Sequence, residues 1–291
     1  MYTVSIFNNK GGVGKSTLTV FMADFLATLR VRERHLRVLV IDMDAQGSCA
    51  TSLLGSSRSS EAKRQGHTLA RLANAVKQPQ ADITPYLIKR PRSRPKGRTQ
   101  PLPELSVVVP DRGEIFAFEA NPLHHLTLLR DRLIPALEPY FDFVLIDQAG
   151  NVDARNLMAI NGLVMSDAVL VPVEPSRISL NAMPDTMETI RHARERGDGI
   201  HPELLGLVLN KADRRTKQFK LHLPDIQELA RALETPWFEN HLPNAPGLAS
   251  ATDDSLAFES LRERYGGYYE QIRKVVKEVL DRLRTLQSQH S

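Results

Sequence analysis

The stretch at residues 8–17, N-N-K-G-G-V-G-K-S-T, constrains the fold of this chain more than any other. It follows a β-branched run at residues 2–7 and precedes residues 18–26, whose apolar spacing is typical of a helix. Strand, glycine-rich turn and helix are the order of a phosphate-binding loop, because glycines let backbone N–H groups approach phosphate and the helix directs its positive end at the anion. Lys15 is then expected to reach the β- and γ-phosphates, and the Ser16 hydroxyl to bind Mg²⁺. The sequence therefore predicts a nucleoside triphosphate site.

The loop departs from the pattern G-x-x-x-x-G-K-[ST], because Asn9 stands at the first glycine and Lys10 follows it. It resembles the deviant Walker A motif, K-G-G-x-G-K-[ST], of the ParA/MinD family of ATPases. The resemblance implies that Lys10 crosses a dimer interface and touches the phosphates of the partner's nucleotide. A cation between two facing triphosphates reduces their repulsion, so ATP would hold the dimer together until hydrolysis. The residues predicted to bind ATP here are Lys10, Gly11, Gly12, Val13, Gly14, Lys15, Ser16 and Thr17, with Lys10 and Lys15 also catalytic.

An apolar run at residues 37–42 ends in a pair of carboxylates, Asp42 and Asp44. The segment resembles the family's D-x-D-P-Q sequence, with Ala45 in the place of the proline. By that match Asp44 is catalytic and orients the attacking water, while Asp42 supports the Mg²⁺ shell.

A second apolar run, at residues 141–147, matches a Walker B strand. Its Asp147 is expected to hold Mg²⁺ together with Ser16 and Asp42. The family commonly has a small or hydroxyl residue and then prolines after this aspartate, whereas this chain has Gln148-Ala149-Gly150. The departure leaves the local loop geometry open and keeps the metal-side carboxylate.

Two later segments are placed as in the family. Asn210, near the end of the apolar run at residues 204–211, matches the position that reads the adenine base. Pro243 lies in residues 242–248, which resemble the loop that closes over the base, although Gly247 stands where an arginine is common.

Short apolar runs alternate with helical stretches along the chain. Such runs predict an α/β fold, with a mostly parallel, twisted β-sheet and helices on both faces. Ligands of such sheets bind at the carboxyl ends of the strands, where the loop and the three aspartates fall. One repeating rhythm over 291 residues favours a single domain, 1–291. The expected strands lie near residues 2–7, 37–42, 105–110, 142–147, 167–173 and 204–210.

Cysteine and histidine argue against two classes of metal protein. Cys49 is the only cysteine, so the chain has no internal disulfide and lacks the ligands of an iron–sulfur cluster. His124 and His125 are adjacent, which does not fit a zinc motif. Because no apolar run has membrane-spanning length and the first strand starts at Tyr2, we expect neither a membrane span nor a signal peptide. The expected location is the cytoplasm, in association with the nucleoid.

Positive charge is concentrated in residues 55–104, which hold 11 Lys and Arg against 3 Asp and Glu. Within this insert, residues 89–98 carry six cations and no acid, with prolines and a glycine that oppose regular structure. We therefore expect a basic, mobile insert. Its function stays open between an arm for the phosphate backbone of DNA and a solvated loop or protein-partner site.

Further basic residues stand at the end of one helix, around the turn after Asn210 and on the C-terminal helix. By resemblance, Arg215 matches a position that ParA proteins of the short, chromosomal type use to bind DNA nonspecifically. The candidate DNA contacts are Arg191, Arg194, Arg214, Arg215, Lys217, Lys274 and Lys277.

The segment at about residues 266–286 predicts an amphipathic C-terminal helix with an apolar stripe at three- and four-residue spacing. Packing against the domain explains such a stripe, and a membrane-surface helix of the MinD kind is the alternative. The polar tail at 287–291, and Glu278 and Asp281 on the charged face, weaken the membrane alternative.

The resemblance implies an ATPase of the short ParA type that uses ATP and Mg²⁺, dimerises with ATP and binds double-stranded DNA nonspecifically. It would partition plasmid or chromosomal DNA, or position another large cargo, with a ParB-like activator that speeds weak basal hydrolysis. The chain leaves no room before the loop for a helix-turn-helix domain, so operator reading is not expected. A MinD-like membrane-cycling ATPase and a metabolic P-loop enzyme are the rival functions.

Overall fold

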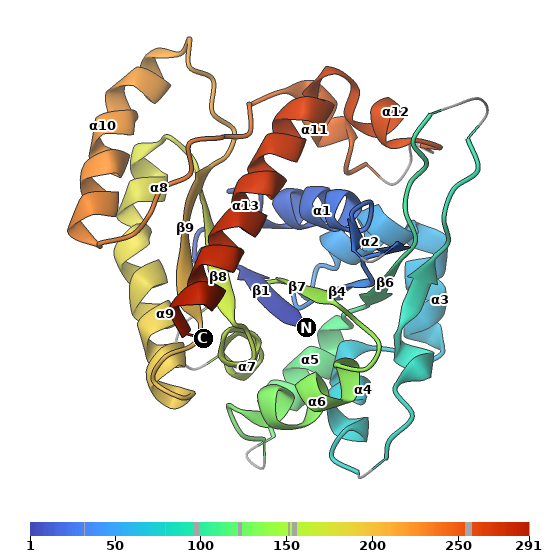
Figure 1. Cartoon of the computed structure of the whole chain (residues 1–291). Helices are drawn as coiled ribbons and strands as arrows, with labels where there is room; N and C mark the ends of the chain where they lie inside the picture. Colours follow the sequence, from blue (N-terminus) through green and yellow to red (C-terminus); the bar gives the residue numbers. More distant parts are fainter. Residues whose placement is uncertain are drawn as a thin grey trace.

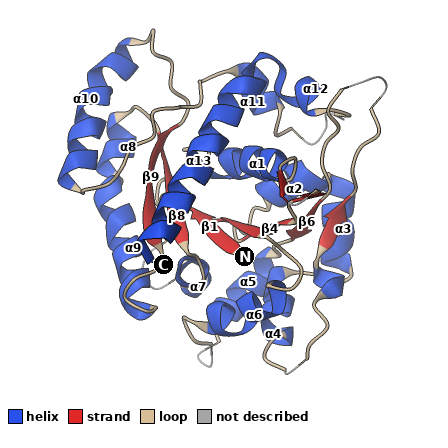
Figure 2. Ribbon diagram, in the orientation of Figure 1, coloured by secondary structure: helices blue, strands red, loops and turns tan. Residues whose placement is uncertain are grey.

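A seven-stranded sheet in the order β5-β6-β4-β7-β1-β8-β9 forms the centre of the computed structural model (Figures 1 and 2). The structure describes residues 1–31, 33–78, 80–95, 99–121, 124–150, 152, 156–253 and 258–290. From β6 across the sheet to β9, each strand pairs in parallel with its neighbour in this order, and β5 pairs antiparallel with β6. The predicted mostly parallel α/β fold is confirmed. The strands of the sheet are β1 (Tyr2–Ile6), β4 (Val38–Asp42), β5 (Ile88–Arg90), β6 (Leu105–Val108), β7 (Phe143–Asp147), β8 (Ala168–Val173) and β9 (Glu203–Leu209).

The inner strands form because their sequences are continuous apolar runs that suit burial on both faces. Every residue of β4, β7 and β8 is buried. Alternate side chains enter different cores: Val38 and Val40 face one core, whereas Leu39 and Ile41 face the other. A separate two-stranded hairpin, β2 (Arg30–Val31) with β3 (Arg34–His35), precedes β4 and was not predicted.

Helices cover both faces of the sheet, as expected (Figure 2). Helices α1, α2, α12 and α13 contribute to the core on one face, and α4, α5, α7, α9 and α10 to the cores on the other. The α-helices are α1 (Lys15–Leu26), α2 (Ser48–Leu54), α3 (Ser56–Arg64), α4 (Leu69–Ala75), α5 (Arg112–Glu119), α6 (Ile134–Leu137), α7 (Leu157–Val164), α8 (Arg177–Asn181), α9 (Met183–Arg196), α10 (Lys217–Ala232), α11 (Pro246–Ser250), α12 (Leu261–Tyr265) and α13 (Tyr269–His290). Single turns η1 (Thr84–Tyr86) and η3 (Gly266–Tyr268) and the π-helix η2 (Leu129–Leu133) complete the set.

The insert at 55–104 contains more regular structure than its composition suggests. Helices α3 and α4 and strand β5 all lie within it. The prediction of irregular structure through 89–98 is wrong at its start, because Lys89 and Arg90 belong to β5. Arg92 and Arg94 follow the strand and are exposed, and residues 96–98 lie outside the described residues.

Arg90 is buried in a charged cluster centred on Asp24 of α1. Its Nη2 donates to Asp24 Oδ1 at 2.5 Å, and Nη1 of Arg264 donates to Asp24 Oδ2 at 3.2 Å. The hydroxyl of Tyr265 also donates to Asp24, at 2.5 Å. The Asp24 cluster therefore ties the insert and α12 to α1, and Arg90 is not free to contact DNA.

The C-terminal helix α13 begins three residues later than expected from the predicted 266–286 and extends to His290. The apolar stripe packs into the core beside α1, with Ile272, Val275 and Val279 buried. The packing interpretation is confirmed, and this stripe is not available to a membrane surface. Among the residues that the structure describes, no helix has the length and apolar character needed to cross a membrane.

Candidate nucleotide site

The phosphate-binding loop joins β1 to α1 at the carboxyl edge of the sheet. Gly12 and Gly14 adopt left-handed backbone with φ of 78° and 87°, which only glycine adopts without strain. A Cβ on Gly14 would lie 2.0 Å from Nδ2 of Asn210, so this glycine also makes room for the base-side segment. The N-cap residue of α1 is Gly14, and no side-chain cap is found at this helix end among the described residues, so its first N–H groups are suited to an anion.

Lys15 is buried beneath this loop. Its Nζ donates to the carbonyl oxygens of Asn8 at 3.0 Å and Lys10 at 3.1 Å. Burial lowers the pKa of Lys15, although Asp147 and Asp44 attract its charge. The ammonium is thus held at the floor of a cavity of about 420 Å³ that Gly11, Ser16, Thr17 and Asp44 also line.

Asp42 and Asp147 stand side by side because β4 and β7 pair in register at these two residues. Both are fully buried. Burial raises the pKa of Asp147 to about 7, against hydrogen bonds from Ser16 and Thr19. Burial and the charge of Asp147 raise the pKa of Asp42 well above its usual value. Two adjacent buried carboxyls that have no guanidinium partner within the described ranges form a site that favours a cation.

The pair offers an oxygen that suits Mg²⁺. Oδ1 of Asp147 accepts from the Thr19 hydroxyl at 3.1 Å, whereas its buried Oδ2 has no hydrogen-bond partner within the described part of the chain. Both oxygens of Asp42 already accept backbone N–H groups, from Asp44 at 3.0 Å and Ala50 at 2.8 Å. Hard cations prefer carboxylate and hydroxyl oxygens, so Asp147 with Ser16 fits Mg²⁺, and Asp42 supports the pair.

Cys49 lies close to the acid pair, and its sulfur and one oxygen of each aspartate are all within 4.8 Å of one another. Burial raises the pKa of the Cys49 thiol well above its usual value. A protonated thiol is a poor ligand for a hard cation, so its role as a small buried filler agrees with the structure.

Gly150 belongs to the segment Gln148-Ala149-Gly150, where the sequence departs from the family's pattern after Asp147. A Cβ there would lie 2.8 Å from Lys15 Nζ and 3.2 Å from the backbone N of Gly11. Gln148 turns inward instead, where its Nε2 donates to Ser5 Oγ at 3.2 Å. The residues after Asp147 therefore pack directly against the phosphate-binding loop, which sequence reasoning left open.

Asn210, at the end of β9, holds the loop in place. Its Nδ2 donates to the carbonyl of Val13 at 2.8 Å, and it is buried. Pro243 follows Leu242, whose backbone N–H donates to the carbonyl oxygen of Leu209 at 2.9 Å. The segment near Pro243 is therefore held at the carboxyl end of β9. Asn210 therefore lies next to the loop, and Pro243 lies near the same carboxyl end of β9.

Lys10 turns toward β8 rather than into solvent. Its Nζ forms an ion pair with Glu174 at 2.9 Å, and Glu174 also pairs with Lys211 at 3.0 Å. Nζ of Lys211 donates further to the carbonyl of Gly12 at 2.5 Å. Sequence reasoning missed Glu174 and Lys211, for which the only signal was their position at the carboxyl ends of β8 and β9.

A model of the AAA_31 family, described as an AAA domain, matches residues 1–204. The chain is 30% identical over 231 residues to the chromosome partitioning protein ParA of Caulobacter vibrioides, which covers 77% of this chain and 74% of that protein. The chain belongs to the ParA/MinD-type P-loop ATPases of the AAA_31 family. The resemblance predicted from the loop is confirmed.

Solved structures agree on the fold of this ParA/MinD-type ATPase. A structure of pNOB8 ParA bound to nonspecific DNA matches with a TM-score of 0.73 and 20% identity, over 98% of this chain and 99% of that chain. An ATP complex of a variant McdA from Cyanothece matches with a TM-score of 0.69 and 19% identity, over 97% and 96%. At these identities the likeness concerns the fold.

The candidate DNA contacts of this ParA/MinD-type ATPase do not form one surface. Arg194 donates to the carbonyl of Pro202 at 2.8 Å, just before β9 begins, whereas Arg214 and Arg215 follow the end of β9. A strand of this length separates the two groups by about 20 Å. Arg191 pairs with Glu195 on the same helix as Arg194. Lys217 begins α10 beside Arg215, and Lys274 and Lys277 are exposed on α13.

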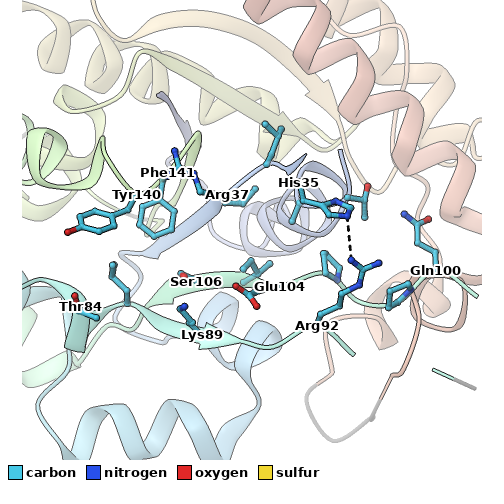
Figure 3. Close-up of a pocket in the computed structure, with 18 residues that line it drawn as sticks. His35, Arg37, Thr84, Lys89, Arg92, Gln100, Glu104, Ser106, Tyr140 and Phe141 are labelled. Carbon is cyan, nitrogen blue, oxygen red and sulfur yellow. Dashed lines mark hydrogen bonds between the residues drawn. The ribbon is translucent and has the colours of Figure 1, made fainter. Parts of the chain in front are cut away.

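A cavity of about 600 Å³ lies away from the nucleotide site, near the beginnings of β4 and β6 (Figure 3). Tyr140 and Phe141 line one end, and Arg92 and His35 meet at the other with a 3.4 Å contact. Its walls include more apolar than polar surface. The described residues that line it include neither a glycine-rich backbone nor paired acids, so the phosphate chemistry fits the smaller cavity at the carboxyl edge.

Proposed function

We propose that this chain is an ATPase that dimerises with ATP, binds DNA nonspecifically and partitions DNA or another large cargo. The single observation that carries the proposal is the position of Lys10. This lysine lies in the deviant loop, and the loop lies at the same carboxyl edge of the sheet as the acid pair, Asp42 and Asp147. Family membership supports ATP as the nucleotide. The remaining steps come from the roles that these residues fit.

The nucleotide would be bound by the loop. Backbone N–H groups of residues 11–17 would contact the phosphates, and Lys15 would neutralise charge between them. Ser16 and Asp147 would hold Mg²⁺, which supplies positive charge to the terminal phosphates when bound. Asn210 and Pro243 would border the base.

Hydrolysis would depend on Asp44. Its carboxylate accepts from the backbone N–H of Gln46 at 2.9 Å and lines the cavity with Lys15. Since Asp44 is less buried than Asp42 and Asp147, it stays accessible to a water molecule near the terminal phosphate. Asp44 would orient that water for attack.

DNA would contact the basic residues nearest the dimer edge. Arg214, Arg215 and Lys217 follow β9, on the same edge as Lys10, so dimerisation through Lys10 would place two copies of this group near one another. Phosphate contacts on one rigid body act at high effective concentration, so the dimer should bind DNA far more tightly than the monomer. Arg191, Arg194, Lys274 and Lys277 would contribute less.

The cellular role would follow from this cycle. ATP-bound dimers would associate with the nucleoid in the cytoplasm, and hydrolysis would release them. A ParB-like adaptor on the cargo would speed a weak basal hydrolysis. The relatives named as partition proteins support this role.

The test compares Lys10→Ala with Lys217→Ala by light scattering and ATP binding. Lys10→Ala is expected to bind ATP with unchanged affinity and to remain a monomer, because it loses the contact with the partner's phosphates and, within the chain, only the ion pair with Glu174. Lys217→Ala is expected to dimerise like the parent protein. An ATP-induced dimer of Lys10→Ala would refute the cross-subunit role.

A further inference from the structure

Glu174 stands between two lysines at the mouth of the phosphate-binding loop. Oε2 accepts from Lys10 Nζ at 2.9 Å, and Oε1 lies 3.0 Å from Lys211 Nζ. Only about a fifth of the Lys10 and Glu174 side chains is exposed, 19% and 20%. Because this pair is shielded from water, it is stronger than a pair on an open surface.

The backbone fixes Glu174 independently of the two lysines. Glu174 follows β8, its N–H donates to the Ser179 hydroxyl at 3.1 Å, and its carbonyl accepts from Ser176 at 2.8 Å. Ser176 in turn caps α8 by accepting from the N–H of Ser179 at 3.3 Å. The carboxylate is therefore presented by a short, closed turn.

Burial opposes ionisation of Glu174, but hydrogen bonds from Lys10 and Lys211 outweigh it and keep its pKa below the usual value. Glu174 is therefore ionised at neutral pH and attracts both ammonium groups. Lys211 also donates to the carbonyl of Gly12, so it stays at the loop whether or not Lys10 is near.

We propose that Glu174 retains Lys10 within its own subunit and thereby opposes ATP-driven dimerisation, as a positioning residue for Lys10. This inference rests on the proposed function, because it concerns the lysine that crosses the dimer interface. The ammonium of Lys10 has to leave Glu174 before it reaches a triphosphate of a second copy of this chain. Lys211 stays on Glu174 at that moment, so release of Lys10 leaves no unpaired buried carboxylate.

The consequence is a threshold for assembly. Each subunit exchanges one ion pair inside the chain for one contact with a phosphate across the interface. A triphosphate carries more negative charge than a carboxylate, so it attracts the Lys10 ammonium more strongly than Glu174 does. A nucleotide without the γ-phosphate carries less negative charge and attracts Lys10 less strongly. Glu174 thus makes dimerisation more dependent on ATP over ADP.

The variant that tests this is Glu174→Gln, which keeps the size of the side chain and removes its charge. Asp213→Asn is the matched control, since Asp213 is an acid near the same strand ends that pairs with Arg215 instead of Lys10. The first readout is acylation of Lys10 by an amine-reactive reagent in the nucleotide-free protein, measured by mass spectrometry. Glu174→Gln should raise the labelling rate of Lys10 about fivefold, and Asp213→Asn should leave it unchanged.

The second readout is the protein concentration at which half the chains dimerise with ATP. Glu174→Gln should lower this concentration about tenfold and allow some dimerisation with ADP. Equal labelling and equal dimerisation in Glu174→Gln and the parent protein would overturn the role of Glu174 and leave the proposed function intact. Faster labelling of Lys10 in a protein that never dimerises with ATP would overturn the proposed function and, with it, the link to assembly.

Discussion

Two buried carboxylate sites in this molecule differ in whether guanidinium groups pair with the carboxylate. Asp24 is surrounded by Arg90, Arg264 and Tyr265, and although burial opposes ionisation, the two guanidinium groups keep its pKa below the usual value. Asp147 has no guanidinium partner and one unpartnered oxygen within the described residues, and its pKa is raised to about 7. Pairing with guanidinium groups marks a structural cluster, whereas a buried carboxyl pair that lacks such partners among the described residues marks a site that favours a cation.

The largest difference should appear in stability. Asp24→Asn leaves two guanidinium groups buried beside an uncharged amide, so the free energy of unfolding should fall by about 3–5 kcal/mol. Asp147→Asn removes a buried charge that Lys15 and the hydroxyls of Ser16 and Thr19 offset only in part, so it should leave the free energy of unfolding unchanged or raise it by about 1 kcal/mol. Urea denaturation measures both. Equal losses in the two variants would remove the distinction between the sites.

Stabilisation by Mg²⁺–ATP should depend on Asp147 and not on the Asp24 cluster. At 100 times its dissociation constant, Mg²⁺–ATP should stabilise the parent protein by about 2.7 kcal/mol. Lys15→Ala should lose this gain because the phosphates lose their cation, and Asp147→Asn should lose the part that depends on Mg²⁺. A milder change in the Asp24 cluster, Tyr265→Phe, should keep the full gain. Thermal unfolding with ATP, with and without Mg²⁺, gives the comparison.

The pH dependence of the nucleotide-free protein should reflect the raised pKa of Asp147. Its stabilising contribution is present below the unfolded-state value and is lost as pH rises through about 7. From pH 5 to pH 6 the parent protein should therefore lose about 1 kcal/mol more of its unfolding free energy than Asp147→Asn does. The lowered pKa of Asp24 acts with the opposite sign and only at more acidic pH, where its contribution is lost as pH falls. Parallel pH profiles for the two proteins would contradict the assignment.

The smallest effect concerns the basic run that contains Arg90. Arg92 and Arg94 are exposed, so replacing both by alanine should change the unfolding free energy by less than about 0.5 kcal/mol, whereas Arg90→Ala should cost several times more. If the two exposed arginines contact DNA, the slope of log affinity against log salt should fall by about 1 for each. An unchanged slope would favour the solvated-loop interpretation.

Much of the nucleotide site could be predicted because its residues are close in sequence and follow buried strands. The loop at 8–17, Asp42 and Asp147 each come at the end of an apolar run, and parallel strands place such ends together. The role of Gly150 could not be predicted from the sequence. A side chain is excluded at this position by its contact with Lys15 and Gly11, which lie far from it along the chain.

The charged clusters could not be predicted for a related reason. Asp24, Arg90 and Arg264 are far apart along the chain, and nothing local indicates that they meet. The composition of residues 89–98 therefore suggested one exposed run where the structure buries Arg90 and exposes Arg92. Glu174 is a similar case, because its pairing with Lys10 joins the phosphate-binding loop to the turn after β8.

In the proposed cycle, ATP converts this chain into a dimer that binds DNA. The most direct test is binding to random-sequence duplex DNA at two salt concentrations, with ATP, with ADP and without nucleotide, alongside the mass in solution. We expect a dimer and strong, salt-sensitive DNA binding with ATP alone. An ATP-dependent dimer that binds no DNA at either salt concentration would contradict it.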